Sequence, residues 1–575
     1  MARLCVYLAR IAPLLSVTGL LMPVLAHAQA TQAPAAAPAA DVFQAAKTLS
    51  SPFPARTSLP VPIFQSQGAG GAAPPAKPPP VSLNLGVEEK ATDNALSTAN
   101  SRKLDLLTSV NPSAAVNYNG RRVQLNANYD LSYDKYLNNS TLDGWRHGGM
   151  GIFDAEIIDQ SLFLDSRYGV TERETSSTGP STAAARTSAT NRTRVTTYSM
   201  TPRIEQRLGH WAVGQISYSH DETINQSTAK VAPTQSSTGA SPAALNNSSG
   251  NDAKVTLRSG EAFSNLLWDY NGEMLQRFQK GVSGSVLTQR THTLGLEYRL
   301  TDSLSVLGEF GNDDIQGNQI SSDVSGRFYN SGLHWKPSDR TDIRAGYGAR
   351  YGTNNLFFLG ERWIGQRTLV RVSHTTGITT DSMSSIDALN AVQRDETGAF
   401  VNPFSGNAAN LSTSTPTLSN ATFRQDTTDA FLSYKTDRNT FSVDSQLLKR
   451  EVIGGGPTTS PATAQGATSA ATAPGAMSTT LSLTLGWDHT LGPRTTFTSS
   501  VGQDEVVATS TPNGKTQRTQ AKASLNYQLG PQVNSYLSYG YMESSSPSTG
   551  TTGAGATGGG KIIENSVIIG LKKHF

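Results

Sequence analysis

Three adjacent residues, Ser219, His220 and Asp221 in the stretch SYSHDE, are of the types that form a hydrolytic triad. In a triad the histidine takes the proton of the serine hydroxyl, and the carboxylate orients the imidazole. These groups have to converge in space, which immediate neighbours on an extended strand do not do. A hydrolase is therefore the weakest hypothesis here, and we assign no catalytic residue and predict that the protein is not an enzyme.

The stretch GNDDIQGN at 311–318 carries two neighbouring carboxylates, Asp313 and Asp314. Carboxylate oxygens bind Ca²⁺ and other hard divalent cations. Its glycines and amides are equally typical of a solvated loop, and we favour that interpretation. The sequence thus predicts no metal ligand and no cofactor.

Four arginines lie in two stretches that alternate polar with apolar residues. Arg344 and Arg350 belong to RTDIRAGYGARYG, and Arg367 and Arg371 to QRTLVRVSH. Side chains alternate between the two faces of a strand, so the pattern puts these guanidinium groups on the polar face. We expect them to line one stretch of a polar interior.

Two interpretations of these arginines remain open. They could form a basic track for an anionic solute or polysaccharide, since guanidinium groups bind such anions strongly. They could instead belong to an interior ladder of charges neutralised by Asp342, Glu361 and Asp381. The second interpretation is the better supported by the sequence.

The composition limits the class of protein to which these residues belong. Of 575 residues, 16% are charged and 37% are hydrophobic, with a net charge of +3. The chain is too polar for a helical membrane protein and has fewer charges than the roughly 25% of a typical soluble domain. The small net charge gives no support for a nucleic-acid partner.

The N-terminus has the features of a secretory signal peptide over residues 1–28. Arg3 and Arg10 give a positively charged n-region before an apolar stretch over 11–25. The small-residue motif AHA predicts cleavage after Ala28. A Pro/Ala/Gly-rich tract follows over 29–80, which we expect to be disordered or polyproline-like.

The only cysteine, Cys5, lies within the predicted signal peptide. We therefore expect the exported chain to have no disulfide and no thiolate metal site. Beyond the signal no run of 18 apolar residues occurs, so a transmembrane helix is not predicted either.

From residue 81 onwards the chain alternates apolar and polar residues with a period of two. The pattern is clearest at 122–134, 294–300, 481–488 and 533–541. Such alternation predicts strands with one apolar and one polar face.

The connections between these strands are of two kinds, which alternate along the chain. Tight ones carry the turn residues Gly, Pro, Asn and Asp and lie at 118–121, 207–210, 300–303, 336–340, 435–439, 491–494 and 529–532. Long ones are rich in Ser, Thr, Gly, Ala and Asn and lie at 173–192, 224–252, 313–325, 382–420, 453–477 and 546–560.

This organisation predicts an all-β fold over 81–575, a transmembrane antiparallel β-barrel. In a bilayer a sheet has to close on itself, because lipid cannot satisfy free backbone groups. Bacterial outer-membrane barrels combine short periplasmic turns, long external loops and an even strand number, and here we expect roughly 20–22 strands. The predicted location is the outer membrane of a Gram-negative cell. A large soluble β-sandwich or propeller is the alternative.

The last strand carries an apolar stripe to the end of the chain: Val567, Ile569, Leu571 and Phe575. This stripe matches the usual C-terminal assembly signal of outer-membrane barrels, and Lys573 departs from it. The expected partners are the barrel-assembly machinery, outer-membrane lipid and lipopolysaccharide.

The chain resembles the outer-membrane β-barrel family associated with PEP-CTERM/exosortase systems. The resemblance is carried by GVEEKATDN (86–94), VNPSAAVNYNGRRVQLNANYDLSYDKY (110–136), LEYRLTDSLSVLGEFGND (296–313) and HWKPSDRTDIRAGYGARYGTN (334–354). It implies a barrel encoded with exopolysaccharide and protein-sorting machinery, and it implies no catalytic residues.

The leading functional hypothesis is a porin-like conduit or an export or assembly component, linked to exopolysaccharide or to PEP-CTERM protein sorting. The alternatives are a non-conducting barrel that displays its external loops and, as the least favoured, an outer-membrane hydrolase. A TonB-dependent transporter is not expected, because it needs a folded plug domain that the tract over 29–80 is too short to supply.

Overall fold

The computed structural model describes residues 80–99, 102–174, 192–227, 246–280, 285–317, 320, 322–395, 398–411, 419–454, 475–508, 515–545 and 561–575. The predicted signal peptide, its cleavage site and all but the last residue of the 29–80 tract lie outside these residues. So does the long connection over 546–560.

The first half of the described chain consists of strands joined by turns and two short 3₁₀ segments. These elements are β1 (Val81–Thr92), β2 (Asp105–Asn119), β3 (Val123–Tyr136), η2 (Ser140–Leu142), β4 (Gly144–Ile158), β5 (Leu162–Glu174), β6 (Arg192–Leu208), β7 (Ala212–Ser227), β8 (Ser248–Ser259), β9 (Leu266–Gln279), β10 (Ser285–Thr301), β11 (Leu304–Gly317), η3 (Ser322–Val324) and β12 (Gly326–Ser338).

The second half continues the same pattern and adds one helix. Its elements are β13 (Thr341–Arg350), β14 (Thr353–Ile364), β15 (Thr368–Thr380), α3 (Asp381–Ala391), β16 (Gln393–Arg394), β17 (Phe400–Val401), β18 (Thr422–Lys435), β19 (Asn439–Gly454), β20 (Met477–Gly492), β21 (Thr495–Ala508), β22 (Lys515–Gly530), β23 (Val533–Ser545) and β24 (Lys561–His574).

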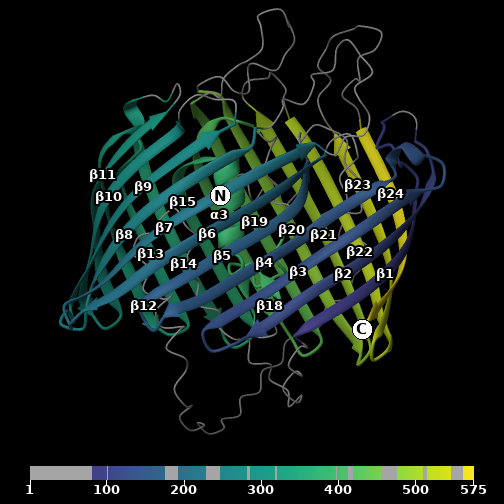
Figure 1. Ribbon diagram of the computed structural model, residues 1–575, viewed down its shortest axis with the longest axis horizontal. Coiled ribbons are helices and arrows are strands. Elements are labelled where there is room, and N and C mark those ends of the chain that lie inside the picture. Colours follow the sequence, from purple (N-terminus) through teal and green to yellow (C-terminus); the bar gives the residue numbers. More distant parts are fainter. Residues whose placement is uncertain are drawn as a thin grey trace, which may run out of the picture. The chain divides into compact units, whose positions relative to one another are not determined.

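All strands except β16 and β17 form one antiparallel sheet of 22 strands (Figure 1). The first strand pairs with the last, from Asn84 opposite His574 to Thr92 opposite Ser566, so the sheet closes on itself. The predicted closed antiparallel barrel and its even strand number are confirmed. Closure leaves no strand edge of this described sheet unpaired, which is the requirement that a bilayer imposes on a sheet.

Short and long connections alternate around the barrel as predicted. At the end that carries Val81 and His574 the turns are tight, with only residues 302–303 between β10 and β11 and 531–532 between β22 and β23. One turn at the opposite end is also tight: β13 and β14 are joined by Tyr351 and Gly352, both with positive φ. Positive φ at both central residues is what a two-residue hairpin turn of type I′ requires.

The outer face of the barrel is apolar along the alternating positions. The predicted C-terminal stripe lies on this face, where Val567, Ile569, Leu571 and Phe575 are each at least 43% exposed. Lys573 also points outward, and its ammonium group lies 4.7 Å from the centre of the Phe575 ring. Exposed apolar side chains on a closed sheet are suited to contact with lipid tails.

Aromatic side chains gather on the outer face near the short-turn end of β18–β21. The rings of Phe441 and Trp487 stack 6.1 Å apart, and Tyr434 and Phe497 flank them. Amphipathic rings of this kind favour the boundary between lipid tails and headgroups. Among the residues that the structure describes, no helix is long and apolar enough to cross a membrane.

The expectation of a long external loop over 382–420 is wrong for most of that stretch. Residues 381–411 fold between the inner faces of opposite strands, and we call them the lumenal segment. It contains α3 and the small hairpin of β16 and β17, and residues 396–397 are not described within it. Figure 1 shows α3 within the outline of the barrel.

Candidate functional site

The lumenal segment begins with a well-capped helix. The Thr380 hydroxyl accepts a hydrogen bond from the backbone N–H of Met383 at 3.2 Å, and Asp381 lies in the first turn. Both features stabilise a helix start, because they satisfy a free N–H group and place negative charge at the positive end of the helix dipole. The chain therefore turns from β15 directly into α3.

Asp381 also fastens the two ends of the long connection to the barrel wall. Its carboxylate accepts hydrogen bonds from Arg450 Nη1 of β19 at 2.6 Å and from the backbone N–H of Ser419 at 2.6 Å. Ser419 lies just before β18, so one buried carboxylate holds the start of the segment, its return and β19 together.

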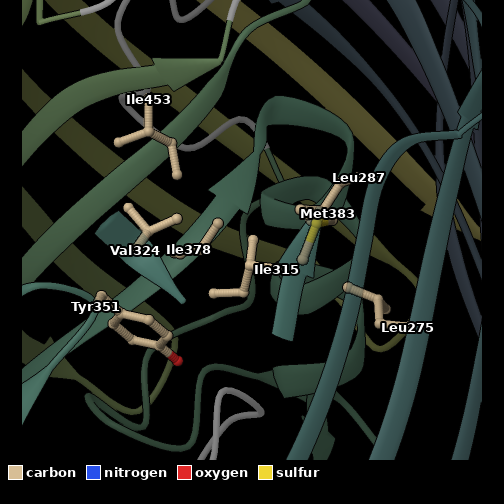
Figure 2. Packing of buried hydrophobic residues seen from close by; sticks show 8 residues of the cluster. All are labelled: Leu275, Leu287, Ile315, Val324, Tyr351, Ile378, Met383 and Ile453. Carbon is tan, nitrogen blue, oxygen red and sulfur yellow. The ribbon is translucent and has the colours of Figure 1, made fainter. Parts of the chain in front are cut away.

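The helix buries its apolar residues against the inner wall. Met383 packs in a buried cluster with Leu275, Leu287 and Ile315, which point inward from β9, β10 and β11 (Figure 2). The cluster also includes Val324, Tyr351, Ile378 and Ile453. Burial of this much apolar surface inside a lumen fixes α3 to one side of the barrel.

A second apolar contact lies near the C-terminal end of the helix, at Leu389. This side chain is fully buried, and a Cβ built on Gly169 of β5 would lie 3.1 Å from its Cδ1 atom. Glycine at position 169 leaves room for the tips of Leu389 and Leu411, whose Cδ1 atoms would lie 3.1 and 2.6 Å from a Cβ there. The helix also packs on β6 and β7.

Arginines of β5 and of the segment itself form the polar anchor on this wall. Arg167 donates to the carbonyl oxygen of Val392 at 2.7 Å, and Arg173 donates to Ser385 Oγ at 2.7 Å. Arg394 of the hairpin donates to Asn126 at 2.7 Å and forms an ion pair with Asp154. These contacts bind the segment to β3, β4 and β5.

Arg371 of β15 holds the other side of the segment. Its Nη1 atom donates to the carbonyl oxygens of Pro403 and Phe404, each at 2.8 Å, and its Nε atom donates to Glu361 at 2.9 Å. The hydrogen bonds from this charged donor hold the backbone at residues 403–404 against β15.

The two anchors lie on opposite sides of the barrel. Half of the 22-strand ring separates β4 from β15. Arg371 and Asn126 are each the fourth residue of their strand from the short-turn end. The lumenal segment therefore enters from the long-loop end, descends most of the barrel height and crosses the lumen along a diameter.

The four predicted arginines do not form one track. Arg344, Arg350 and Arg371 lie on the inner face of β13 and β15, as the alternation indicated. Arg367 instead lies in the turn between β14 and β15, where its side chain is 59% exposed and faces Asp437 at 3.7 Å. The strand begins at Thr368, so the face assignment does not extend to Arg367.

Each inward arginine of this set faces a carboxylate. Arg350 makes a two-pronged pair with Asp313, with nitrogen–oxygen distances of 2.7 and 3.0 Å. Arg344 Nε lies 3.7 Å from Asp342, and Arg371 pairs with Glu361. The geometry favours the neutralised ladder over an anion track, with the difference that Asp381 pairs with Arg450.

We expect Asp313→Ala to destabilise the barrel by about 3–5 kcal/mol, because it leaves Arg350 buried without its counter-charge. Asp313 is 2% exposed, and the Arg350 guanidinium also covers the Phe328 ring at 3.9 Å. Urea unfolding in detergent, followed by loss of heat-resistant migration on a gel, measures the change. The double variant with Arg350→Met should recover most of the stability; equal loss in both variants would contradict a role for the pair.

The other candidate residues do not come together. Ser219 points inward to Thr201, His220 points outward to Asn251, and Asp221 pairs with Arg277 on the inner face. Neighbours on a strand occupy opposite faces, so the serine and histidine cannot share a proton. Nothing in this arrangement supports a triad.

The expectation of a solvated loop at 311–318 is also wrong, because residues up to Gly317 belong to β11. Asp313 points inward, whereas Asp314 points outward to Arg290 at 3.1 Å. In the described part of the chain no cluster of three histidine or acidic side chains could hold a metal ion.

The comparisons with known proteins give no family: no family model matches the chain, and neither does any curated protein. Three solved structures to which it is similar are a siderophore receptor, PirA from Acinetobacter baumannii; the FrpB iron transporter from Neisseria meningitidis; and OprD from Pseudomonas aeruginosa.

The identities to these three are 9%, 12% and 12%, and the TM-scores are 0.43, 0.42 and 0.28. Each match covers 86% of this chain and, respectively, 80%, 82% and 95% of the other. At such values the activities of these proteins cannot be transferred to this chain.

Proposed function

We propose that this protein is a porin-like conduit of the Gram-negative outer membrane whose passage is narrowed by the lumenal segment. The observation that carries the proposal is the polar interior of a closed barrel, crossed by one segment that Arg371, Arg394 and Arg450 hold in place. A polar lumen excludes lipid and admits water, and a fixed constriction sets the size of what passes.

The proposed role within the cell is in exopolysaccharide export or PEP-CTERM protein sorting, as the resemblance of the sequence implies. The expected assembly route is through the barrel-assembly machinery and the C-terminal stripe that ends at Phe575. Co-occurrence of polysaccharide-synthesis and exosortase genes with this one supports the role, and their consistent absence contradicts it.

Purified protein reconstituted into planar lipid bilayers tests the conduit directly. We expect discrete conductance steps in salt solution, smaller than those of an unobstructed barrel of the same strand number. A preparation that is folded, as shown by heat-modifiable migration, and yet gives no current would contradict the proposal.

The second candidate is a non-conducting barrel that displays its external loops. It is favoured by one observation: the lumenal segment crosses the lumen from β15 to β4 on the opposite side. The same bilayer experiment separates the two functions, because only a display barrel stays silent while folded.

A further inference from the structure

The inner wall of the barrel has two chemically different parts. The contacts of the lumenal segment described above lie on β3–β7, on β15 and β19 and, through Met383, on β9–β11. The inner faces of β20–β24 and β1 form an uninterrupted stretch of the ring on which none of these contacts lies. We call these faces the hydroxyl-rich wall.

Side chains with hydroxyl and amide groups dominate the hydroxyl-rich wall. Each strand contributes at least one at an inward position: Thr484, Ser500, Ser524, Ser538, Ser566 and Asn84. Their sequence neighbours Leu525, Leu537 and Val567 are exposed on the lipid face, which fixes the inward direction of the polar set. Ser524 and Ser538 bond to each other across the strands at 2.7 Å.

The inward-facing charged side chains of this wall are of both signs, so the wall is neither basic nor acidic. Lys90 and Glu564 form a buried pair at 3.2 Å. Asp504 of β21 lies opposite Arg518 of β22 in the register. The remaining inward charges include Asp488 and Lys522, which carry opposite signs.

The wall that the segment covers is different, because it is dense in ion pairs. Examples are Asp134 with Arg146 on β3 and β4, and Asp221 with Arg277 on β7 and β9. Where charges pair with each other they are not available to a solute. The covered wall thus serves as scaffold, and the hydroxyl-rich wall is the part of the ring that the described contacts of the segment leave out.

We propose that the solute path runs along the hydroxyl-rich wall and takes uncharged, polyhydroxylated solutes, that is, neutral saccharides. A hydroxyl or amide group both donates and accepts, so it exchanges hydrogen bonds with sugar hydroxyls as water does. An ionised solute loses hydration in such a wall without gaining a counter-charge. The inference rests on the proposed conduit and adds its substrate class.

An aromatic ring on the same wall suits this class. Tyr536 of β23 lies over Gly570 of β24, where a Cβ would be only 2.3 Å from its Cζ atom. Only glycine lets the ring settle against the neighbouring strand at this position. A ring held in this way is a rigid surface in a wall where hydroxyl and amide side chains dominate, and it can pack on the C–H faces of a sugar.

The test compares three hexasaccharides of equal length in planar bilayers: neutral maltohexaose, anionic hexagalacturonate and cationic glucosamine hexamer. The frequency of transient current blocks at equal concentration measures entry. For the native protein we expect maltohexaose to block about 10-fold more often than either charged sugar. Equal block frequencies for all three overturn the substrate class while leaving the conduit intact.

A matched pair of variants tests the location of the path. Ser500→Arg places a cation on the hydroxyl-rich wall, whereas Ser217→Arg places the same group on the inner face of β7, a strand on which α3 packs. We expect Ser500→Arg to raise hexagalacturonate block frequency about 10-fold and Ser217→Arg to leave it nearly unchanged. Equal shifts in both variants overturn the assigned path. Folded protein without any current overturns the conduit itself and this inference with it.

Discussion

Removal of the lumenal segment should raise the single-channel conductance about threefold or more, since a helix with its side chains is about 10 Å across and lies within the lumen. The variant replaces residues 381–419 with a short Gly/Ser turn. Thr380 and Thr422 already lie opposite each other in the register of β15 and β18, so a hairpin turn can join the two strands. Planar bilayer recordings at fixed salt give the measurement.

The control removes residues 456–474 from the connection between β19 and β20 and replaces them with the same Gly/Ser turn. This variant should keep the conductance of the native protein, because it removes none of the residues named above that hold the segment in the lumen. An unchanged conductance after removal of 381–419 would mean that the segment does not obstruct the passage.

A charge on the lipid face of the last strand should prevent stable assembly. Ile569 is 61% exposed on the outer face, six residues before the chain end at Phe575, which places it well inside the apolar band. Ile569→Arg is expected to cost about 2–4 kcal/mol, the value for arginine near the middle of the bilayer. Yield of heat-modifiable barrel in membrane fractions measures the effect.

The neighbouring residue provides the matched control. Ile568 points inward, opposite Lys90 in the register of β24 and β1. Ile568→Arg introduces the same charge into a polar lumen, so its barrel yield should stay close to that of the native chain. If the two variants assemble equally well, the assignment of inner and outer faces on β24 is wrong.

The fold could be predicted from the sequence because the alternation of apolar and polar residues along a barrel strand is a local pattern. On a barrel strand each side chain faces either lipid or water, so alternation alone assigns the faces, as it did for Arg344 and Arg371. The rule fails at strand ends. Arg367 has the right parity but lies one residue before β15, and Asp313 looks like a loop residue although β11 extends past it.

The inward course of residues 381–411 was missed because it depends on contacts between residues far apart in sequence. Taken whole, the connection over 382–420 is rich in Ser, Thr and Asn like the other long connections. Arg394 is held by Asn126 and Asp154, and no short-range pattern announces such pairs. One local signal was present: Met383, Ile386 and Leu389 recur with helical spacing behind the capping residue Thr380, and all three are buried.

The central claim is that the lumenal segment lies across the barrel, and a disulfide tests it most directly. The chain has one cysteine, Cys5, within the predicted signal peptide, so an introduced pair has no competitor in the exported protein. Gly169→Cys and Leu389→Cys join β5 to α3, where a Cβ at position 169 lies 3.1 Å from Leu389 Cδ1. Leu389→Cys with Ser524→Cys on β22 is the control pair.

Mass spectrometry of peptides from non-reduced outer membranes gives the result. The account predicts a cross-linked 169–389 peptide in most of the folded protein and no 389–524 peptide. Absence of the 169–389 link, together with ready labelling of the thiol introduced at position 389 by a membrane-impermeant reagent added to intact cells, would place the segment outside the barrel and contradict the account.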